Sequence, residues 1–409
     1  MIPSIDHISD RLERHIAAVG YRGFDPHDGL NGRWVRALTF DNRMLGVLAL
    51  QFFKRCPLNL RPLFGIRPGI NPKGWGLLAA AYGSRYRRTG ATSDLASATR
   101  FADWLVDNAT PSASGIGWGY NFPWPNRNDY YPSGLPTIVN TAYVGFALLD
   151  VHALAPHTRY LDAVRRSMEF ILRDLARTGT PASFCWSYTP QGVTRIHNAS
   201  LLGAALAARL HAVEGRDELR AAALGAVRWS LERQRPDGSW WYGEEERNRW
   251  IDSYHTGYNL LALRDVDRVF PGDGLSVALR KGYAYYLDHF FEPDGKVKYY
   301  HNRGIPYDAH AAAHALLTLR ELRNLDPDRS DMLWRRVWTK TVSLFWDERR
   351  GCFHYALTRF GLNRIDYIRW VQAWMFYAMA RCQELDAADA AERLDPVVHF
   401  PPDQEMPQE

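Results

Sequence analysis

The chain has 409 residues, a net charge of +5 and an aromatic content of 13%, including 15 tryptophans. Its charge is dispersed and forms no basic stripe, which argues against a nucleic-acid partner. The N-terminus lacks the apolar core of a signal peptide, and no apolar run approaches the roughly 20 residues of a membrane span. The four scattered cysteines, Cys56, Cys185, Cys352 and Cys382, favour reduced thiols, a cytoplasmic protein and no cysteine-based metal site.

Amphipathic helices with one charged face recur along the chain, and each precedes a helix that is apolar nearly all round. We expect the amphipathic, outer helices at about 42–55, 93–109, 159–177, 217–234, 275–291 and 331–346. The apolar, inner helices are expected at about 72–88, 138–153, 197–213, 253–268, 308–324 and 366–385. Ala and Gly are frequent in the inner helices, which lets such helices pack closely.

A turn and an aromatic extended pair separate the two helices in every unit after the first. These pairs lie at 115–126, 183–192, 238–245, 295–304 and 351–361. In the fourth unit the turn is Pro236-Asp237-Gly238, in which Pro fixes φ and Gly accepts a positive φ. The whole unit repeats roughly every 60 residues, which indicates a repeat architecture.

The repeat predicts an all-α protein, an (α/α)6 toroid of six helical hairpins with short aromatic β-hairpin loops at one end. We expect a single domain over residues 1–409, with an N-terminal extension over about 1–40 and a disordered tail over about 390–409. An open right-handed solenoid is the alternative, but it needs polar capping repeats, and neither end of the sequence has an obvious one.

Residues 40–385 resemble, in architecture, the six-hairpin toroids of glycoside hydrolases, polysaccharide lyases and uronyl C5-epimerases. The segments GYRGFDPHDGLNG (20–32) and NLRPLFGIRPGINPKGWG (59–76) are also similar to an uncharacterised bacterial family found with surface-polysaccharide genes. QRPDGSWWYG (234–243) resembles a repeat of squalene–hopene cyclases. The chain lacks the DxDD cluster of those cyclases and the zinc ligand set of protein prenyltransferases. These differences argue against isoprenoid chemistry and favour the resemblance to carbohydrate-active toroids.

Polar residues open five of the inner helices, where an all-buried helix would have apolar ones. Burying an unpaired polar group costs about 1–3 kcal/mol, so a shared wet cavity at this end explains them. The candidate catalytic residues there are Asp252, Asp308, Glu245, His255 and His310. The candidate substrate-binding residues are Trp118, Tyr120, Trp124, Asn140, Trp186, His197, Asn198, Trp240, Trp241, Tyr258, Arg303, Arg369 and Gln372.

Each assignment has a structural alternative. Asn140, His197 and Asp308 could cap their helices. The tryptophans could be packing wedges between hairpins, and two of the three acids Glu244–Glu246 could be solvated. Asp252 and His255 form the stronger pair, because residues i and i+3 share one face of a helix.

Three functions follow from these residues. The leading hypothesis is hydrolysis of a glycosidic bond in a poly- or oligosaccharide, which would use two carboxyl groups as general acid and base, with aromatic rings holding the sugar. Elimination or C5-epimerisation of a uronate would use His197, His255, Tyr258 or His310 as base and Asn198, Arg303 or Arg369 to neutralise the carboxylate. A non-catalytic glycan-binding or polysaccharide-assembly protein is the third. In each case the partner is an oligo- or polysaccharide; no metal, no cofactor and no oligomeric state is indicated.

Overall fold

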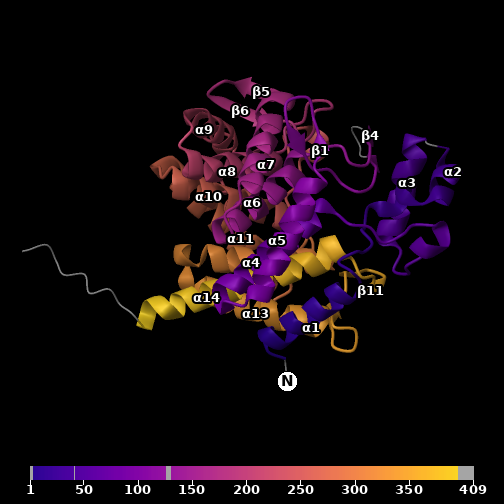
Figure 1. The fold of residues 1–409 in the computed structure, drawn as a ribbon. Helices are drawn as coiled ribbons and strands as arrows, with labels where there is room; N and C mark the ends of the chain where they lie inside the picture. Colours follow the sequence, from indigo (N-terminus) through magenta and orange to yellow (C-terminus); the bar gives the residue numbers. More distant parts are fainter. Residues whose placement is uncertain (1–2, 41, 126–129, 395–409) are drawn as a thin grey trace, which may run out of the picture.

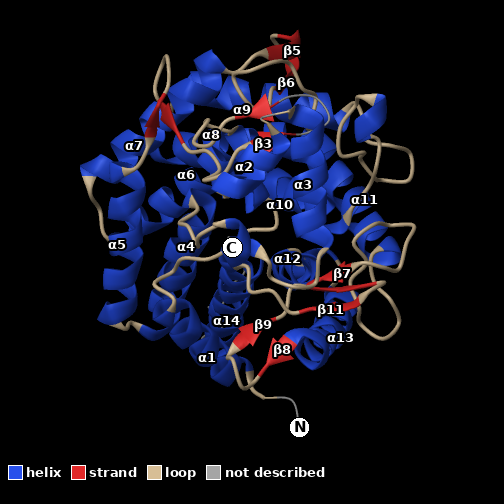
Figure 2. Ribbon diagram, turned by 90° about the vertical axis from the view of Figure 1, so that its right-hand side faces the viewer, coloured by secondary structure: helices blue, strands red, loops and turns tan. Residues whose placement is uncertain are grey.

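The computed structural model describes residues 3–40, 42–125 and 130–394. Inner helices surround a central axis, each contacts the next along the chain, and the last contacts the first. They are α4 (Pro72–Thr89), α6 (Ile138–Leu154), α8 (His197–Glu214), α10 (Ser253–Val269), α12 (Ala309–Glu321) and α14 (Ala373–Leu394). The contact between α14 and α4 closes the ring (Figures 1 and 2), which confirms the (α/α)6 toroid and rejects the open solenoid.

An outer helix packs against each inner helix. The outer helices are α1 (Ile5–Ala18), α5 (Thr92–Asp107), α7 (Thr158–Glu169), α9 (Asp217–Leu231), α11 (Asp273–His289) and α13 (Pro327–Phe345). The partner of α14 is α1, so the ring is closed by the N-terminal helix. The prediction that 42–55 forms an outer helix is wrong, as is the placing of α1 in an extension outside the toroid. No described helix is long and apolar enough to cross a membrane.

Small residues allow the inner helices to approach closely. A Cβ atom on Gly145 of α6 would lie 2.7 Å from the side chain of Leu206 on α8. One on Gly203 of α8 would lie equally close to Ile138 of α6. These contacts explain the Ala and Gly content of the inner helices, because any larger side chain there would push the two helices apart.

Short strands lie between the outer and inner helices, at the end of the ring where the inner helices begin. The pairs are β1 (Thr110–Pro111) with β2 (Ile116–Gly117), β3 (Trp124–Pro125) with β4 (Tyr130–Tyr131), β5 (Arg177–Thr180) with β6 (Ser183–Trp186) and β8 (Trp346–Asp347) with β9 (Cys352–Phe353). A three-stranded sheet has the order β11 (Gly361–Asn363), β10 (Ala356–Thr358), β7 (Tyr307–Asp308). We call this the hairpin end, and the other the opposite end.

The expected strand pairs of the fourth and fifth units do not form among the described residues; their residues make single bridges to other segments, Gly243 to Ile196, Val297 to Phe291 and Tyr300 to Asp252. Short helical turns complete the fold: the 3-10 turns η4 (Glu246–Asn248) and η5 (Arg323–Leu325), and the π-helical turns η3 (Phe170–Asp174) and η6 (Ile368–Gln372). The predicted disordered tail from about 390 begins within α14, and its residues 395–409 lie outside the described residues.

Residues 20–71, between α1 and α4, form an insert at the hairpin end. The insert contains η1 (Asp28–Asn31), α2 (Arg33–Thr39), α3 (Arg43–Arg55) and η2 (Arg61–Phe64). It has a small core of its own, made by Leu30, Val35, Leu50, Phe53 and Ile66. Figure 1 shows α2 and α3 standing out from the ring. Helix α3 contacts β3.

Candidate functional site at the hairpin end

Asp252 is the N-cap of α10 and holds the ring of His255. One carboxylate oxygen, Oδ1, accepts a hydrogen bond from the backbone N–H of His255 at 2.9 Å. The other, Oδ2, accepts from His255 Nδ1 at 2.7 Å and from the Trp250 indole at 3.0 Å. The Asp252 side chain is fully buried, whereas that of His255 is 19% exposed. Because Nδ1 carries the proton donated to Asp252, the neutral ring keeps a lone pair on Nε2.

Asp308 occupies the equivalent position at the start of α12. Its Oδ1 accepts from the backbone N–H of Ala311 at 2.7 Å, and its Oδ2 accepts from the Trp370 indole at 3.3 Å. Burial raises the pKa of this carboxyl to about 6. Asp308 therefore caps its helix, as one interpretation of the sequence expected, whereas Asn140 and His197 do not: Thr137 and Ile196 take the cap positions of α6 and α8.

His310 is buried and has a partner on each ring nitrogen. Nδ1 lies 3.1 Å from the carbonyl oxygen of Trp370, so Nδ1 carries the proton and donates it. Nε2 then accepts from the hydroxyl of Tyr258 at 2.8 Å. Burial, followed by the charge of Lys73, lowers the pKa of His310 well below its usual range. The structure thus makes His310 a neutral acceptor inside the ring.

Lys73 of α4 lies beside Tyr258 of α10, with its ammonium group 3.4 Å from the tyrosine hydroxyl. The rings of Tyr143, Tyr258 and Trp374 surround it at 4.0, 4.9 and 5.2 Å. Burial, followed by the charge of Arg369, lowers the pKa of Lys73 well below its usual range. These aromatic side chains form a layer across the ring between its two ends.

The insert contributes residues that the sequence did not indicate as site residues. Asp25 accepts two hydrogen bonds from the guanidinium of Arg369, at 2.5 and 2.8 Å. His27 lies against the ring of Trp370, with centroids 5.4 Å apart, and its Nε2 is 3.5 Å from Lys54 Nζ. Burial, then the charge of Lys54, lowers the pKa of His27 to about 4. Asp308 and Asp252 are among the charges that act on Lys54.

Some of the aromatic residues predicted to bind a sugar are partly exposed to solvent at the hairpin end. Tyr120 and Trp124 are partly exposed, and the hydroxyl of Tyr120 is 2.7 Å from that of Tyr188. Trp241 is also partly exposed and lies between the guanidinium groups of Arg235 and Arg249. The unpredicted rings of Tyr242, Trp250 and Tyr299 are partly exposed as well.

Three predicted sugar-stacking tryptophans are instead packing residues. Trp118, Trp186 and Trp240 are at most 1% exposed, so no ring face is open to a sugar. The indole N–H of Trp118 donates to the Leu105 carbonyl, and that of Trp240 to the Ser230 carbonyl, both at 2.9 Å.

Arg369 and Gln372 are also not free to bind a substrate, because their polar groups are engaged within the protein. Arg369 is neutralised by Asp25, as described above. The amide of Gln372 donates to the Phe353 carbonyl at 2.7 Å and accepts from the Phe353 backbone N–H at 3.0 Å. Arg303 is exposed and lies over the ring of Tyr300.

The third candidate acid, Glu245, is an ion-pair partner of Arg195 at 3.1 Å. Its neighbour Glu244 pairs with His197, at 2.9 Å from Nε2. His197 is fully buried, and Asn140 and Asn198 are buried beside the start of their helices. Both polar atoms of the Asn140 amide and the carbonyl oxygen of Asn198 have no hydrogen-bond partner among the described residues.

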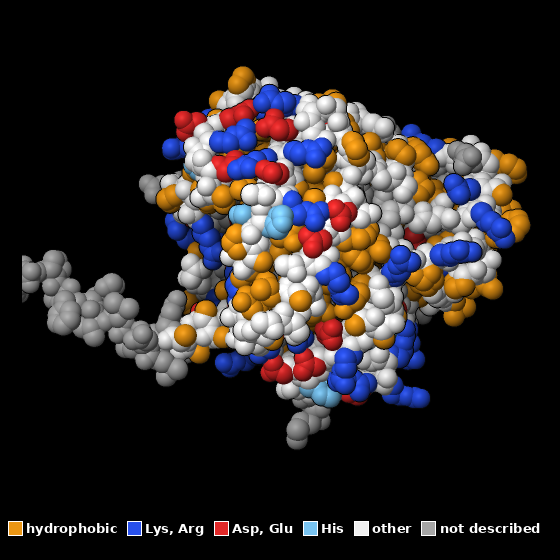
Figure 3. All heavy atoms as spheres, viewed as in Figure 1, with side chains coloured by type: hydrophobic (Ala, Val, Ile, Leu, Met, Phe, Trp, Pro, Cys, Tyr) orange, Lys and Arg blue, Asp and Glu red, His pale blue; other side chains and the backbone are white. Residues whose placement is uncertain are grey.

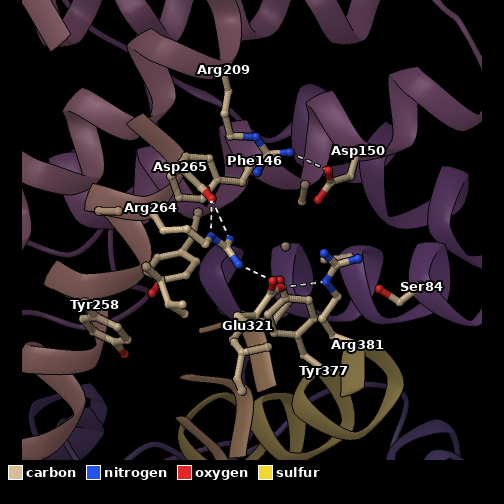
Figure 4. Close-up of a pocket in the computed structure, with 18 of the residues that line it drawn as sticks. Ser84, Phe146, Asp150, Arg209, Tyr258, Arg264, Asp265, Glu321, Tyr377 and Arg381 are labelled. Carbon is tan, nitrogen blue, oxygen red and sulfur yellow. Dashed lines mark hydrogen bonds and ion pairs between the residues drawn. The ribbon is translucent and has the colours of Figure 1, made fainter. Parts of the chain in front are cut away.

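A cavity of about 330 Å³ lies inside the ring toward the opposite end (Figure 4). Tyr258 and Trp374 of the aromatic layer line it, and so does His314. Charged side chains also line the cavity, and most of them pair with one another: Glu321 accepts from Arg264 and, at 2.8 Å, from Arg381. Arg264 also donates to Asp265, as Figure 4 shows. The sequence did not indicate this cavity.

One group of possible metal ligands occurs among the described residues. The ligand atoms of His15, Cys352 and Asp366 lie within 4.8 Å of one another. His15 Nε2 is 2.7 Å from Asp366, and burial raises the pKa of the Cys352 thiol to about 12. The contact between His15 and Asp366 joins α1 to the loop before α14, which explains why these side chains lie together.

No family model matches the chain, and no curated protein matches its sequence. Solved structures do match. A cellobiose 2-epimerase from Bacillus thermoamylovorans aligns with a TM-score of 0.67 and 11% identity, over 94% of this chain and 99% of the epimerase. A sugar epimerase from a ruminal bacterium aligns with a TM-score of 0.63 and 13% identity, over 94% and 98%.

A family 76 glycoside hydrolase, a mannosidase from Bacteroides thetaiotaomicron, aligns with a TM-score of 0.62 and 10% identity, over 94% of this chain and all 100% of the hydrolase. These proteins share the (α/α)6 toroid of this chain, as the sequence resemblance implied. At these identities the likeness concerns the fold, and function has to be argued from the site.

Proposed function

We propose that the protein is a carbohydrate-active enzyme that transfers a proton at a sugar carbon next to a carbonyl group. Epimerisation or isomerisation of a sugar and elimination from a uronate all begin with this step. The observation that carries the proposal is the Asp252–His255 pair. Asp252 holds Nδ1–H at 2.7 Å, and the partly exposed ring offers Nε2 as a general base.

Hydrolysis by two carboxylates has less support from the same residues. Both oxygens of Asp252 and both oxygens of Asp308 already accept hydrogen bonds from backbone or indole N–H groups. Both residues are at most 2% exposed. A general acid or a nucleophile needs an oxygen that reaches the scissile bond, so we assign the two acids to positioning rather than to bond cleavage.

The insert offers the charge that proton abstraction needs. Removing a proton next to a carbonyl places negative charge on the carbonyl oxygen, and a nearby cation lowers the energy of that intermediate. Lys54 is the candidate, because its ammonium group lies 3.5 Å from His27 Nε2. Burial lowers the pKa of Lys54, and the charges of Asp308 and Asp252 raise it against that effect. His255 would take the proton on Nε2 and return it to the same or a neighbouring carbon. The epimerases among the similar structures support a reaction of this class.

Solvent exchange tests the proposal. The protein is incubated in D2O with aldoses, ketoses and uronates, and NMR follows the C–H signals next to the carbonyl. We expect loss of one such signal with a substrate, and absorbance of an unsaturated uronate if the substrate undergoes elimination. Release of a sugar from a glycoside without any exchange would contradict the proposal and restore the hydrolase interpretation.

A pair of matched variants locates the base. Asp252→Asn leaves a cap on α10 but weakens the hold on the His255 tautomer, so we expect about 10–100-fold slower exchange. Asp308→Asn changes the equivalent cap of α12 and one of the charges that act on Lys54 but no contact of His255, so its loss of exchange should be clearly smaller. Equal losses in both variants would contradict the assignment of His255.

A further inference from the structure

The insert presents an apolar face to solvent. More than half of the large hydrophobic side chains that are exposed in the described chain lie within residues 34–63. On α3, Met44, Leu48 and Phe52 follow one another at intervals of one helical turn, 76%, 63% and 50% exposed. On and after α2, Trp34, Leu38 and Phe40 are 53%, 66% and 83% exposed. We call these six residues the apolar face.

The small core of the insert does not need these side chains. Gly46, Leu50 and Phe53 form the buried stripe of α3, and Val35 is buried on α2. Each helix is therefore apolar on its inner side and on part of its outer side. An exposed apolar surface of this extent on a soluble domain marks a binding surface.

Positive charge surrounds the apolar face. Residues 33–67 contain Arg33, Arg36, Arg43, Lys54, Arg55, Arg61 and Arg67 against one acid, Asp41. Arg61 is buried, and Lys54 faces the site, but the other five arginines are exposed. Figure 3 shows orange and blue side chains together on the lobe that Figure 1 labels α2 and α3.

We propose that the apolar face docks on a membrane surface that contains anionic lipid. Aromatic and leucine side chains enter the boundary between headgroups and acyl chains, while arginines bind anionic headgroups. A second copy of the chain fits less well, because a twofold contact through this face would bring the same arginines of both copies together. The proposed attachment is peripheral, because it uses exposed side chains of α2 and α3 and the residue after α2.

Docking would also orient the hairpin end. The apolar face and Lys54 lie on different sides of α3, so the insert would stand between the membrane and the group around His255. This orientation of the hairpin end does not depend on which reaction the protein catalyses. Vesicle binding, which tests it, is measured without an activity assay.

Vesicle flotation tests the docking with the full chain. We expect the protein to float with vesicles of phosphatidylcholine and phosphatidylglycerol, less with phosphatidylcholine alone, and less as salt is raised. The double variant Met44→Gln/Leu48→Gln should bind about a hundredfold more weakly, because each buried apolar side chain contributes about tenfold to partitioning. Arg33→Gln/Arg36→Gln should remove mainly the preference for anionic lipid.

Met332→Gln is the matched control, because Met332 is an exposed methionine on the outer helix α13. It should bind vesicles like the wild type. All the substituted side chains are exposed, and melting curves will show whether each variant stays folded. Absence of vesicle binding by the folded wild type would overturn the proposal. A dimer in light scattering that Met44→Gln/Leu48→Gln dissociates would instead assign the face to a second copy.

Discussion

The two ends of the ring differ in what they provide for a substrate: one has a cavity, and the other has a histidine that can accept a proton. The opposite end has the cavity of about 330 Å³, but most of the charged side chains that line it are paired with one another, as Glu321 is with Arg264 and Arg381. The hairpin end has His255, whose Nε2 has no hydrogen-bond partner among the described residues, and the neutral His27 beside Lys54. Reactivity depends on an unsatisfied base rather than on volume, so the comparison favours the hairpin end as the reaction site.

The aromatic layer of Tyr143, Tyr258 and Trp374 around Lys73 separates these ends. Tyr258 belongs to both sides, because its hydroxyl donates to His310 while the residue also lines the cavity. Changes at one end should therefore leave the other end largely intact unless they disturb this layer. The following variants use that separation.

The largest effect should come from the base. His255→Asn removes Nε2 as a base, and we expect deuterium exchange to fall about 10²–10⁴-fold, the usual contribution of a general base. The matched variant at the opposite end is Arg268→Gln, which lines the cavity and is exposed. It should change the rate by less than about twofold, since surface substitutions rarely act beyond their neighbours. Loss of exchange in Arg268→Gln alone would move the reaction to the cavity.

The two ends should also titrate differently. The folded-state pKa of His27 is about 4, below its ordinary value of 6.5. The stability that this group contributes is thus present above pH 6.5 and is lost as pH falls to 4, about 3 kcal/mol in all. At the opposite end, burial raises the pKa of Glu321, but Arg264 and Arg381 outweigh it and lower the pKa to about 2. Its contribution is present above pH 4.5 and is lost as pH falls through 2.

Denaturant unfolding at several pH values checks this difference. His27→Gln should flatten the fall in free energy of unfolding between pH 6.5 and 4 relative to the wild type. Glu321→Gln should be less stable than the wild type throughout, with the gap closing only below pH 4.5. A His27→Gln variant with the wild-type slope would show that His27 is protonated in the folded protein.

The ring could be predicted from the sequence because it follows from a local repeat. Contacts between distant parts of the chain could not be predicted in this way. The small residues of the inner helices and the i, i+3 spacing of Asp252 and His255 are local patterns that sequence alone reveals. The pairing of α1 with α14 and of Asp25 with Arg369 joins distant parts of the chain. No period leads to such pairs, so the insert at the hairpin end was missed.

Residue type alone also could not separate buried from available aromatics. Trp118 and Trp124 stand six positions apart in one loop, yet the first is a packing wedge and the second is partly exposed. The segment 20–32 did hold a signal, since its resemblance to another family includes Asp25 and His27. The segment shows no helical period, so the sequence offered no reason to place it over the site.

The smallest effect should come from the layer between the ends. A Cβ atom on Gly257 of α10 would lie 2.4 Å from the ring of His314 on α12, beside Tyr258. Gly257→Ala should therefore lower the free energy of unfolding by about 1–3 kcal/mol through overpacking. Gly274→Ala on the outer helix α11 is the matched control, because no atom lies within 4 Å of its Cβ position. It should be neutral or stabilise by up to about 1 kcal/mol, since alanine favours helix.

Thermal melts of Gly257→Ala and Gly274→Ala decide whether this layer is rigid. If Gly257→Ala melts like the control, the ring of His314 moves aside without a cost in stability. The layer around Tyr258 is then deformable, and a change at one end of the ring can alter the other. If it melts lower and deuterium exchange slows as well, the packing of α10 against α12 also sets the position of His255. A lower melting temperature with unchanged exchange is what we expect, because His255 is held at the helix start by Asp252 and not by the α10–α12 contact.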